Sequence, residues 1–138
     1  MVDVADVLAV WEAAIAAPYT GRPVWVHGDM TGSNLLVEEG RLAGLIDFGS
    51  SAVGDPACDL VLAWTLLHGE GRAAFRAGVP ADEAGWARAH GWAIWKALLT
   101  VAQGADAPAA EQRYGWRCPS MELITELVTE HAAAEKRA

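Results

Sequence analysis

The chain has 138 residues, of which 53% are hydrophobic and 20% are charged. A chain of this length can bury a real core, and the composition is that of a globular domain rather than a disordered segment. The net charge of −8 excludes the basic surface that DNA- and RNA-binding proteins use. It suits a neutral or cationic small molecule better than a polyanion, or it serves solubility alone.

Two features of the sequence bear on its cellular compartment. Cys58 and Cys118 are the only cysteines, and they have neither the number nor the spacing of a disulfide framework or a metal cage. This favours a reducing cytoplasm. The N-terminus shows no export signal and the chain has no apolar run of roughly 18 residues, so the sequence predicts neither secretion nor a membrane span.

The first predicted element is a helix. Apolar residues recur at steps of three and four over residues 4–17, Asp3 is a suitable N-cap, and Pro18 ends the pattern.

Short apolar runs follow, each long enough for one strand: residues 24–26, 35–37 and 42–46. Glu39 and Gly40 form a turn that joins the last two as a hairpin. Three short strands cannot form a core alone. We therefore expect one small antiparallel strand layer lying across a helical body.

The rest of the chain has the pattern of helices. We expect one helix capped by Asp55 and ended by residues 69–71, one over residues 72–77, one from Asp82 to about Gln103, and one after Pro119. The third is apolar on nearly all sides, so it should be largely buried, with Trp92 and Trp95 in the core. On the last helix, Glu122, Glu126 and Glu130 should face away from the core.

Polar side chains gather in the loops at the ends of the predicted strands. Residues 27–34 separate the first two strands, and residues 47–49 follow the third. The hairpin should bring Asp47 back beside Asp29 and Asn34. One carboxylate that orients and deprotonates a hydroxyl, with an amide oxygen and a second carboxylate to hold Mg²⁺, is the set that phosphoryl transfer requires. Any one of these residues alone would more simply be a turn former.

Three segments of the chain resemble, in order, the motifs of kinase-like enzymes. Residues 27–34 are similar to the catalytic loop H-R-D-x-x-x-x-N of eukaryotic-type kinases, with Gly28 in place of the arginine. Residues 47–49 are similar to the metal-binding D-F-G, and residues 54–60 to a G-D-P-x-x-D segment. Together they resemble the aminoglycoside phosphotransferase family, whose relatives include macrolide and choline kinases, over about residues 24–103.

The resemblance implies a role for each matching residue. Asp29 would be the catalytic base, and Asn34 and Asp47 would bind Mg²⁺ and with it the nucleotide. His27 would hold the loop by hydrogen bonds, and Asp59 would brace it from the following helix. The implied fold is α+β, a protein-kinase-like C-terminal lobe that is mostly helical, with a small antiparallel strand layer carrying the catalytic loop.

The implied function is transfer of the γ-phosphate of ATP or GTP to a hydroxyl of a small molecule, such as an aminoglycoside or macrolide antibiotic. Acidic residues such as Glu70, Asp106 and Glu111 would attract a cationic aminoglycoside, whereas the seven tryptophans would equally suit an apolar macrolide. The sequence leaves both acceptors open, as it does ATP and GTP.

The family's N-terminal lobe carries a nucleotide-covering loop and a strand lysine, and no such segment precedes the catalytic loop. The only lysines, Lys96 and Lys136, come later, in predicted helices. We therefore expect residues 1–138 to be the C-terminal lobe alone. It is either the catalytic part of an enzyme or a catalytically silent truncated lobe that serves as a binding or oligomerisation module.

Without a covering lobe, the apolar residues of the strand layer should be partly exposed. They could join two copies of the chain as a homodimer, unless the helix over residues 4–17 folds across them. The residues concerned are Val24, Trp25, Leu35, Leu36, Leu42 and Leu45.

Overall fold

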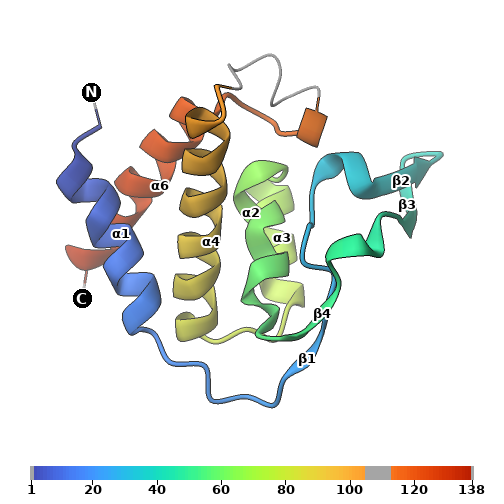
Figure 1. Cartoon of the computed structure of the whole chain (residues 1–138), viewed down its shortest axis with the longest axis horizontal. Coiled ribbons are helices and arrows are strands. Elements are labelled where there is room, and N and C mark those ends of the chain that lie inside the picture. The colour runs from blue at the N-terminus through green and yellow to red at the C-terminus, as the bar shows by residue number, and fades with distance from the viewer. Residues whose placement is uncertain (1, 105–112, 138) are drawn as a thin grey trace.

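The computed structural model describes residues 2–104 and 113–137. Figure 1 shows a helical body with the strands gathered at one end of it. The α-helices are α1 (Val4–Ala16), α2 (Leu62–Thr65), α3 (Gly69–Gly78), α4 (Glu83–Ala102) and α6 (Ser120–Glu135). The strands are β1 (Val24–Val26), β2 (Leu35–Glu38), β3 (Arg41–Leu45) and β4 (Ala52–Gly54). Short 3₁₀ helices are η1 (Gly32–Asn34), η2 (Phe48–Ser50) and η3 (Pro56–Val61).

The central element of the helical body is α4, which packs against α1, α6 and η3. Asp82 caps it as predicted, with a carboxylate oxygen 2.7 Å from the Gly85 amide nitrogen. Small residues let its neighbours come close. A Cβ added at Gly91 would lie 2.3 Å from the Cβ of Ala14, so α1 sits directly on the α4 backbone.

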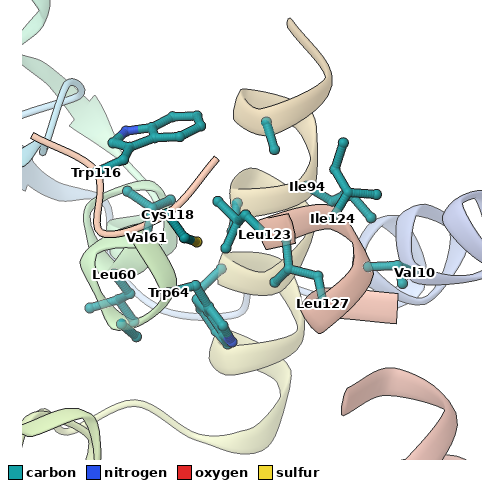
Figure 2. Packing of buried hydrophobic residues seen from close by; sticks show 14 of the residues in the cluster. Val10, Leu60, Val61, Trp64, Ile94, Trp116, Cys118, Leu123, Ile124 and Leu127 are labelled. Carbon is teal, nitrogen blue, oxygen red and sulfur yellow. The ribbon is translucent and has the colours of Figure 1, made fainter. Parts of the chain in front are cut away.

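The core lies where the helices meet (Figure 2). Ile94 of α4, Leu123 and Leu127 of α6, Val10 of α1 and the large ring of Trp64 of α2 are all almost fully buried. Burial of this apolar surface is the main stabilising contribution to the fold. No helix within residues 2–104 and 113–137 has both the length and the apolar character needed to span a bilayer.

A network of charged residues closes one side of the core. Arg72 pairs with Glu126 and with Glu130, each at 2.6 Å, and Arg117 also donates to Glu126. Burial alone would raise the pKa of Glu126, but the hydrogen bonds and charges of Arg117 and Arg72 outweigh it and lower the pKa. Glu130 accepts a hydrogen bond from the Trp64 indole at 2.7 Å. The prediction that Glu126 and Glu130 face away from the core is therefore wrong.

The strands form two separate two-stranded antiparallel ladders, β1 with β4 and β2 with β3. The prediction of one layer of three strands missed β4, a run of only three residues that ends in glycine. The β2–β3 turn was predicted correctly: Glu39 and Gly40 have positive φ angles of 49° and 76°, as a tight hairpin turn requires.

Two helix boundaries differ from the prediction. Asp55 does cap its segment, accepting from the Ala57 amide at 3.1 Å, but the segment begins as the 3₁₀ helix η3 and becomes α-helical only at α2. Gly69 starts α3 instead of ending the preceding helix, and its φ of +50° is the reason a glycine stands there.

The tryptophans predicted for the core on α4 lie elsewhere. Trp92 and Trp95 are 43% and 42% exposed, because α4 turns a stripe of small residues toward the core instead. This stripe comprises Ala89, Ala93 and Ala97, all fully buried. Helix α4 is apolar on nearly all sides, but only the side that carries the alanines is buried in the core.

The strand layer carries an exposed apolar surface, here called the strand-layer patch. Trp25 is 79% exposed and Leu35 is half-buried. Helix α1 packs on α4 and α6 at the opposite end of the molecule from β2 and β3 (Figure 1), so the alternative in which α1 covers the patch is wrong. The other exposed members of the patch are Val24, Leu36, Leu42 and Leu45.

Buried His90 predicts a pH dependence of stability. Its Nε2 has no hydrogen-bond partner among the described residues, and its ring lies 5.0 Å from that of Trp64. Burial first, and then the charges of His131, Arg76 and Arg72, lower the pKa of His90 from 6.5 to about 4. The unfolded chain binds a proton at His90 more readily than the folded chain does. The stability that goes with a neutral His90 is therefore fully present above pH 6.5 and is lost as the pH falls toward 4.

Lowering the pH from 7 to 5 should therefore cost about 2 kcal/mol of unfolding free energy. Urea unfolding at the two pH values measures this loss, and His90→Gln should remove most of it. Glu126 does not interfere, because a lowered carboxyl pKa costs stability only below the ordinary value of 4.5. An equal loss in His90→Gln and in the unaltered chain would contradict the assignment.

Candidate active site

The loop after β1 is held by a carboxylate from η3. Asp59 accepts hydrogen bonds from the main-chain amides of His27 at 2.6 Å and Gly28 at 2.9 Å. Hydrogen bonds to a charged acceptor are the strong ones. Since η3 packs on α4 and β1, Asp59 ties the loop to the helical body.

His27 joins the same loop to the end of β3. Its Nε2 lies 2.8 Å from the Ile46 carbonyl oxygen, and its Nδ1 accepts from the Asp29 amide at 3.3 Å. These two contacts assign the proton to Nε2, which donates to the carbonyl. The ring also contacts Phe48, with centroids 4.8 Å apart. His27 is thus a linker between the two loops.

Asn34 makes the second link. Its side-chain NH₂ group donates to the main-chain carbonyl oxygen of Asp29 at 2.9 Å. The main-chain carbonyl oxygen of Asn34 accepts a hydrogen bond from the Ile46 amide at 3.0 Å. The side chain is buried. Its Oδ1 has no hydrogen bond among the described residues, so a hard oxygen is left for a cation.

Asp47 follows Ile46 and is therefore next to both links. Its φ of 62° and ψ of 61° lie in the left-handed region, which costs a non-glycine residue about 1–2 kcal/mol. Its carboxylate is exposed and accepts no hydrogen bond from the part of the chain that the structure describes. Strain of this kind gathers at functional sites. An exposed carboxylate and an amide oxygen such as Asn34 Oδ1 are hard donors of the type that Mg²⁺ takes together with phosphates and water.

Asp29 has a partner that the sequence interpretation missed. Its Oδ1 lies 2.8 Å from the Nζ of Lys96 on α4, and the two side chains are 39% and 15% exposed. Asp29 Oδ2 has no hydrogen bond among the described residues. In the sequence analysis, Lys96 was noted only because its position after the catalytic loop rules it out as the strand lysine of an N-terminal lobe. Lys96 is the one charged residue in the otherwise uncharged run of residues 91–102, and that was the signal that could have revealed it.

A cleft of about 300 Å³ opens beside this ion pair. Asp29 and Gly28 form one side of it, and Trp92, Trp95 and Lys96 of α4 form another. Asn34 and Asp47 do not line it: Asn34 bonds to the Asp29 carbonyl oxygen, and Asp47 follows Ile46, whose amide donates to the Asn34 main-chain carbonyl. The structure therefore brings Asp29 to the cleft itself.

A cysteine lines the cleft, and three acidic residues were expected to attract the acceptor. Burial raises the pKa of the Cys58 thiol to about 11, and the Asp59 carboxylate adds to the rise, so Cys58 remains a protonated thiol and no nucleophile. Of the acidic residues considered for the acceptor, Glu70 lies on α3 and does not line the cleft. Asp106 and Glu111 lie outside the described residues.

The chain is similar in sequence to known proteins. A family model described as "Phosphotransferase enzyme family" matches residues 2–92. An aminoglycoside 3'-phosphotransferase from Escherichia coli is 41% identical over 60 residues, which are 43% of this chain and 22% of that protein. One from Salmonella typhimurium is 38% identical over 50 residues, 36% of this chain and 18% of that protein.

The fold has a solved counterpart. The apo form of a thermostable mutant of aminoglycoside phosphotransferase APH(4)-Ia matches with a TM-score of 0.54 and 19% identity, over 96% of this chain and 46% of that one. Identity this low bears on the fold alone, and the expected α+β fold is confirmed. The chain spans less than half the length of the relatives that it matches.

The loop geometry makes a prediction about Gly28. Its φ is +80°, and an added Cβ would lie 2.3 Å from the main-chain oxygen of Ser50. Gly40 is a matched control, because its φ is +76° but a Cβ there would meet nothing within 4 Å. Gly40→Ala should cost about 1–2 kcal/mol through backbone strain alone. Gly28→Ala should cost at least about 1 kcal/mol more, because the Ser50 main chain must also move. Urea unfolding compares the two, and equal costs would contradict the tight approach.

Proposed function

Because this chain belongs to the phosphotransferase enzyme family, which includes the aminoglycoside phosphotransferases, we propose that it is the catalytic lobe of a kinase-type phosphotransferase. The reaction is transfer of the γ-phosphate of ATP or GTP to a hydroxyl of a small molecule, an antibiotic in the first instance. The observation that carries the proposal is the bond from the Asn34 amide to the Asp29 carbonyl, which joins a base and a cation ligand in one rigid loop.

The role of Asp29 in this reaction follows from its free oxygen. Lys96 occupies Oδ1, so Oδ2 is the atom that can accept the proton of an acceptor hydroxyl as the hydroxyl attacks the phosphorus. The hydroxyl approaches from the cleft, where Asp29 is exposed. His27 and Asp59 act on this step by holding the loop, not by touching the reactants.

Asn34 and Asp47 are the proposed Mg²⁺ ligands. Asn34 Oδ1 and the Asp47 carboxylate are hard oxygen donors without protein partners among the described residues, which fits an ion that binds few protein groups and keeps phosphate and water ligands. Bound Mg²⁺ would neutralise charge on the phosphates. The buried amide of Asn34 and the left-handed backbone of Asp47 hold the two donors in place before the nucleotide arrives.

A nucleotide-binding lobe, either ahead of this one or supplied separately, completes the proposed enzyme. No other part of residues 2–104 and 113–137 offers the strand lysine that such a lobe supplies, since Lys96 is engaged with Asp29. The cytoplasm is the proposed location, in keeping with the two cysteines of the sequence.

A second proposal concerns the strand-layer patch. Its exposure supports the alternative in which this chain acts as a silent lobe that associates through the patch, as a homodimer. The two arrangements exclude each other in any one molecule, because a nucleotide lobe and a second copy would compete for the same surface.

The roles of the two aspartates predict different defects. In a protein that joins this chain to a nucleotide-binding lobe, Asp29→Asn should slow phosphoryl transfer about 10²–10⁴-fold and leave nucleotide affinity nearly unchanged, because a base is not needed to hold the nucleotide. Asp47→Ala should lower Mg²⁺-nucleotide affinity as well, because it removes a metal ligand. Steady-state kinetics and nucleotide titration measure both. Unchanged turnover in Asp29→Asn would remove Asp29 from the mechanism.

The patch predicts self-association of the isolated chain. Burying apolar surface is worth roughly 25 cal/mol per Å², and the unpaired strand edges add to the drive. Light scattering over a range of concentrations should show a dimer, and Trp25→Ser should shift it toward monomer. Val4→Ser on α1 is the control, since Val4 is 71% exposed but lies at the other end of the molecule. A chain that is monomeric at every concentration would rule out the homodimer.

A further inference from the structure

A serine hydroxyl lies in the same cleft as the proposed base. Ser50 lines the cleft of about 300 Å³ together with Asp29 and Gly28. Ser50 is exposed, and its hydroxyl makes no hydrogen bond with the residues that the structure describes. This hydroxyl is therefore available to a group that enters the cleft.

The main chain holds Ser50 in place from two sides. A Cβ added at Gly28 would lie 2.3 Å from the main-chain oxygen of Ser50 and 3.4 Å from its Cβ. Ser50 therefore packs directly on the residue before Asp29. On the other side, Ser50 ends the 3₁₀ helix η2, whose N-cap is Asp47, and a main-chain hydrogen bond of 3.1 Å closes this turn. Ser50 is thus tied both to the proposed base and to a proposed Mg²⁺ ligand.

This position matters for the direction of phosphoryl transfer. In the proposed reaction the γ-phosphate is held beside Asp47 and is attacked by a hydroxyl that gives its proton to Asp29. A hydroxyl that the chain itself fixes between these two groups needs no binding step. Groups held in this way react at a high effective concentration, so Ser50 competes with any free acceptor.

The described walls of the cleft carry two further hydroxyl groups, and both are less suitable. Thr100 is buried, and its hydroxyl donates to the Lys96 carbonyl oxygen at 2.9 Å. Tyr114 comes from the segment ahead of α6, and its ring packs on that of Trp116 with centroids 5.7 Å apart. Of these hydroxyls, that of Ser50 is the one held next to the catalytic loop.

We propose that Ser50 is an internal phosphate acceptor of this site. Its Oγ attacks the γ-phosphorus of a bound nucleoside triphosphate and forms a new O–P bond. The bond from the γ-phosphorus to the bridging oxygen breaks, nucleoside diphosphate leaves, and the Ser50 proton passes to Asp29 Oδ2. The inference rests on the proposed function, because it uses the same base and the same nucleotide.

Phosphorylated Ser50 closes the cleft to other acceptors. A phosphate group on serine carries a charge of about −1.5 to −2 at pH 7. It occupies part of the cleft and lies near the Asp29 carboxylate, so a small molecule can no longer bring a hydroxyl to Asp29. The site therefore silences itself when nucleotide is present without an acceptor, and a bound acceptor protects Ser50.

The test uses the complete enzyme, in which this chain is joined to a nucleotide-binding lobe. The protein is incubated with Mg²⁺ and ATP, or Mg²⁺ and GTP, without an acceptor, and peptide mass spectrometry locates the added phosphate. Ser50 should carry it, Ser50→Ala should not be modified there, and Asp29→Asn should slow the modification about 10²–10⁴-fold. Later turnover of kanamycin A should fall in proportion to the modified fraction, and kanamycin A present from the start should protect Ser50.

Ser51→Ala is the matched control. Ser51 is the next residue, but its hydroxyl is shielded from solvent and has no hydrogen-bond partner among the described residues. This variant should be modified at Ser50 as fast as the unaltered protein.

The outcomes separate the inference from the proposed function. An enzyme that phosphorylates kanamycin A but never carries phosphate on Ser50 would overturn the inference alone, as would equal modification of Ser50 in Asp29→Asn. Phosphate on Ser50 without turnover of kanamycin A would support the inference and contradict only kanamycin A as the acceptor. A protein that neither modifies Ser50 nor consumes nucleotide would overturn both.

Discussion

The site depends on one carboxylate that receives two main-chain amides. Asp59 accepts from His27 and Gly28, and without it the amide of buried His27 would lose its partner at a cost of about 1–3 kcal/mol. Asp59 itself lies on η3, which packs against α4. The position of Asp29, the next residue along the loop, is therefore set by the helical core rather than by the two short strand ladders.

A second constraint fixes the two loops relative to each other. Both hydrogen-bonding groups of the Ile46 main chain are taken, the carbonyl by His27 and the amide by Asn34. Asp47 comes next, and its backbone lies in the left-handed region, which is unfavourable for residues other than glycine. Such strain persists only where the surroundings over-determine the backbone. The contacts of Ile46 fix the residue directly before Asp47, whose exposed carboxylate has no partner of its own among the described residues.

Features that depend on residues close together in the sequence were predicted correctly, and features that depend on distant partners were missed. Caps and turns were predicted because their causes are local: Asp82 needs only the amides of its own first turn, and Gly40 only a positive φ. The order of the three motifs along the chain likewise predicted which loops hold the site and which family the chain resembles. Glu126 and Lys96 were misjudged because their partners, Arg72 and Asp29, lie more than 50 residues away in sequence. Helical periodicity gives which residues share a face, and not which neighbour that face meets.

Helix α4 shows how the core and the cleft depend on the same spacing. Ala93 and Ala97, four residues apart, face the core, and their small size lets α4 approach its neighbours. Trp92 and Lys96, offset from them by one residue, then face the cleft. Since an ammonium reaches a carboxylate oxygen at 2.8 Å only if its helix is close enough, the width of the core determines whether Lys96 can pair with Asp29. The pairing of Lys96 with Asp29 is thus a consequence of how tightly the helices pack.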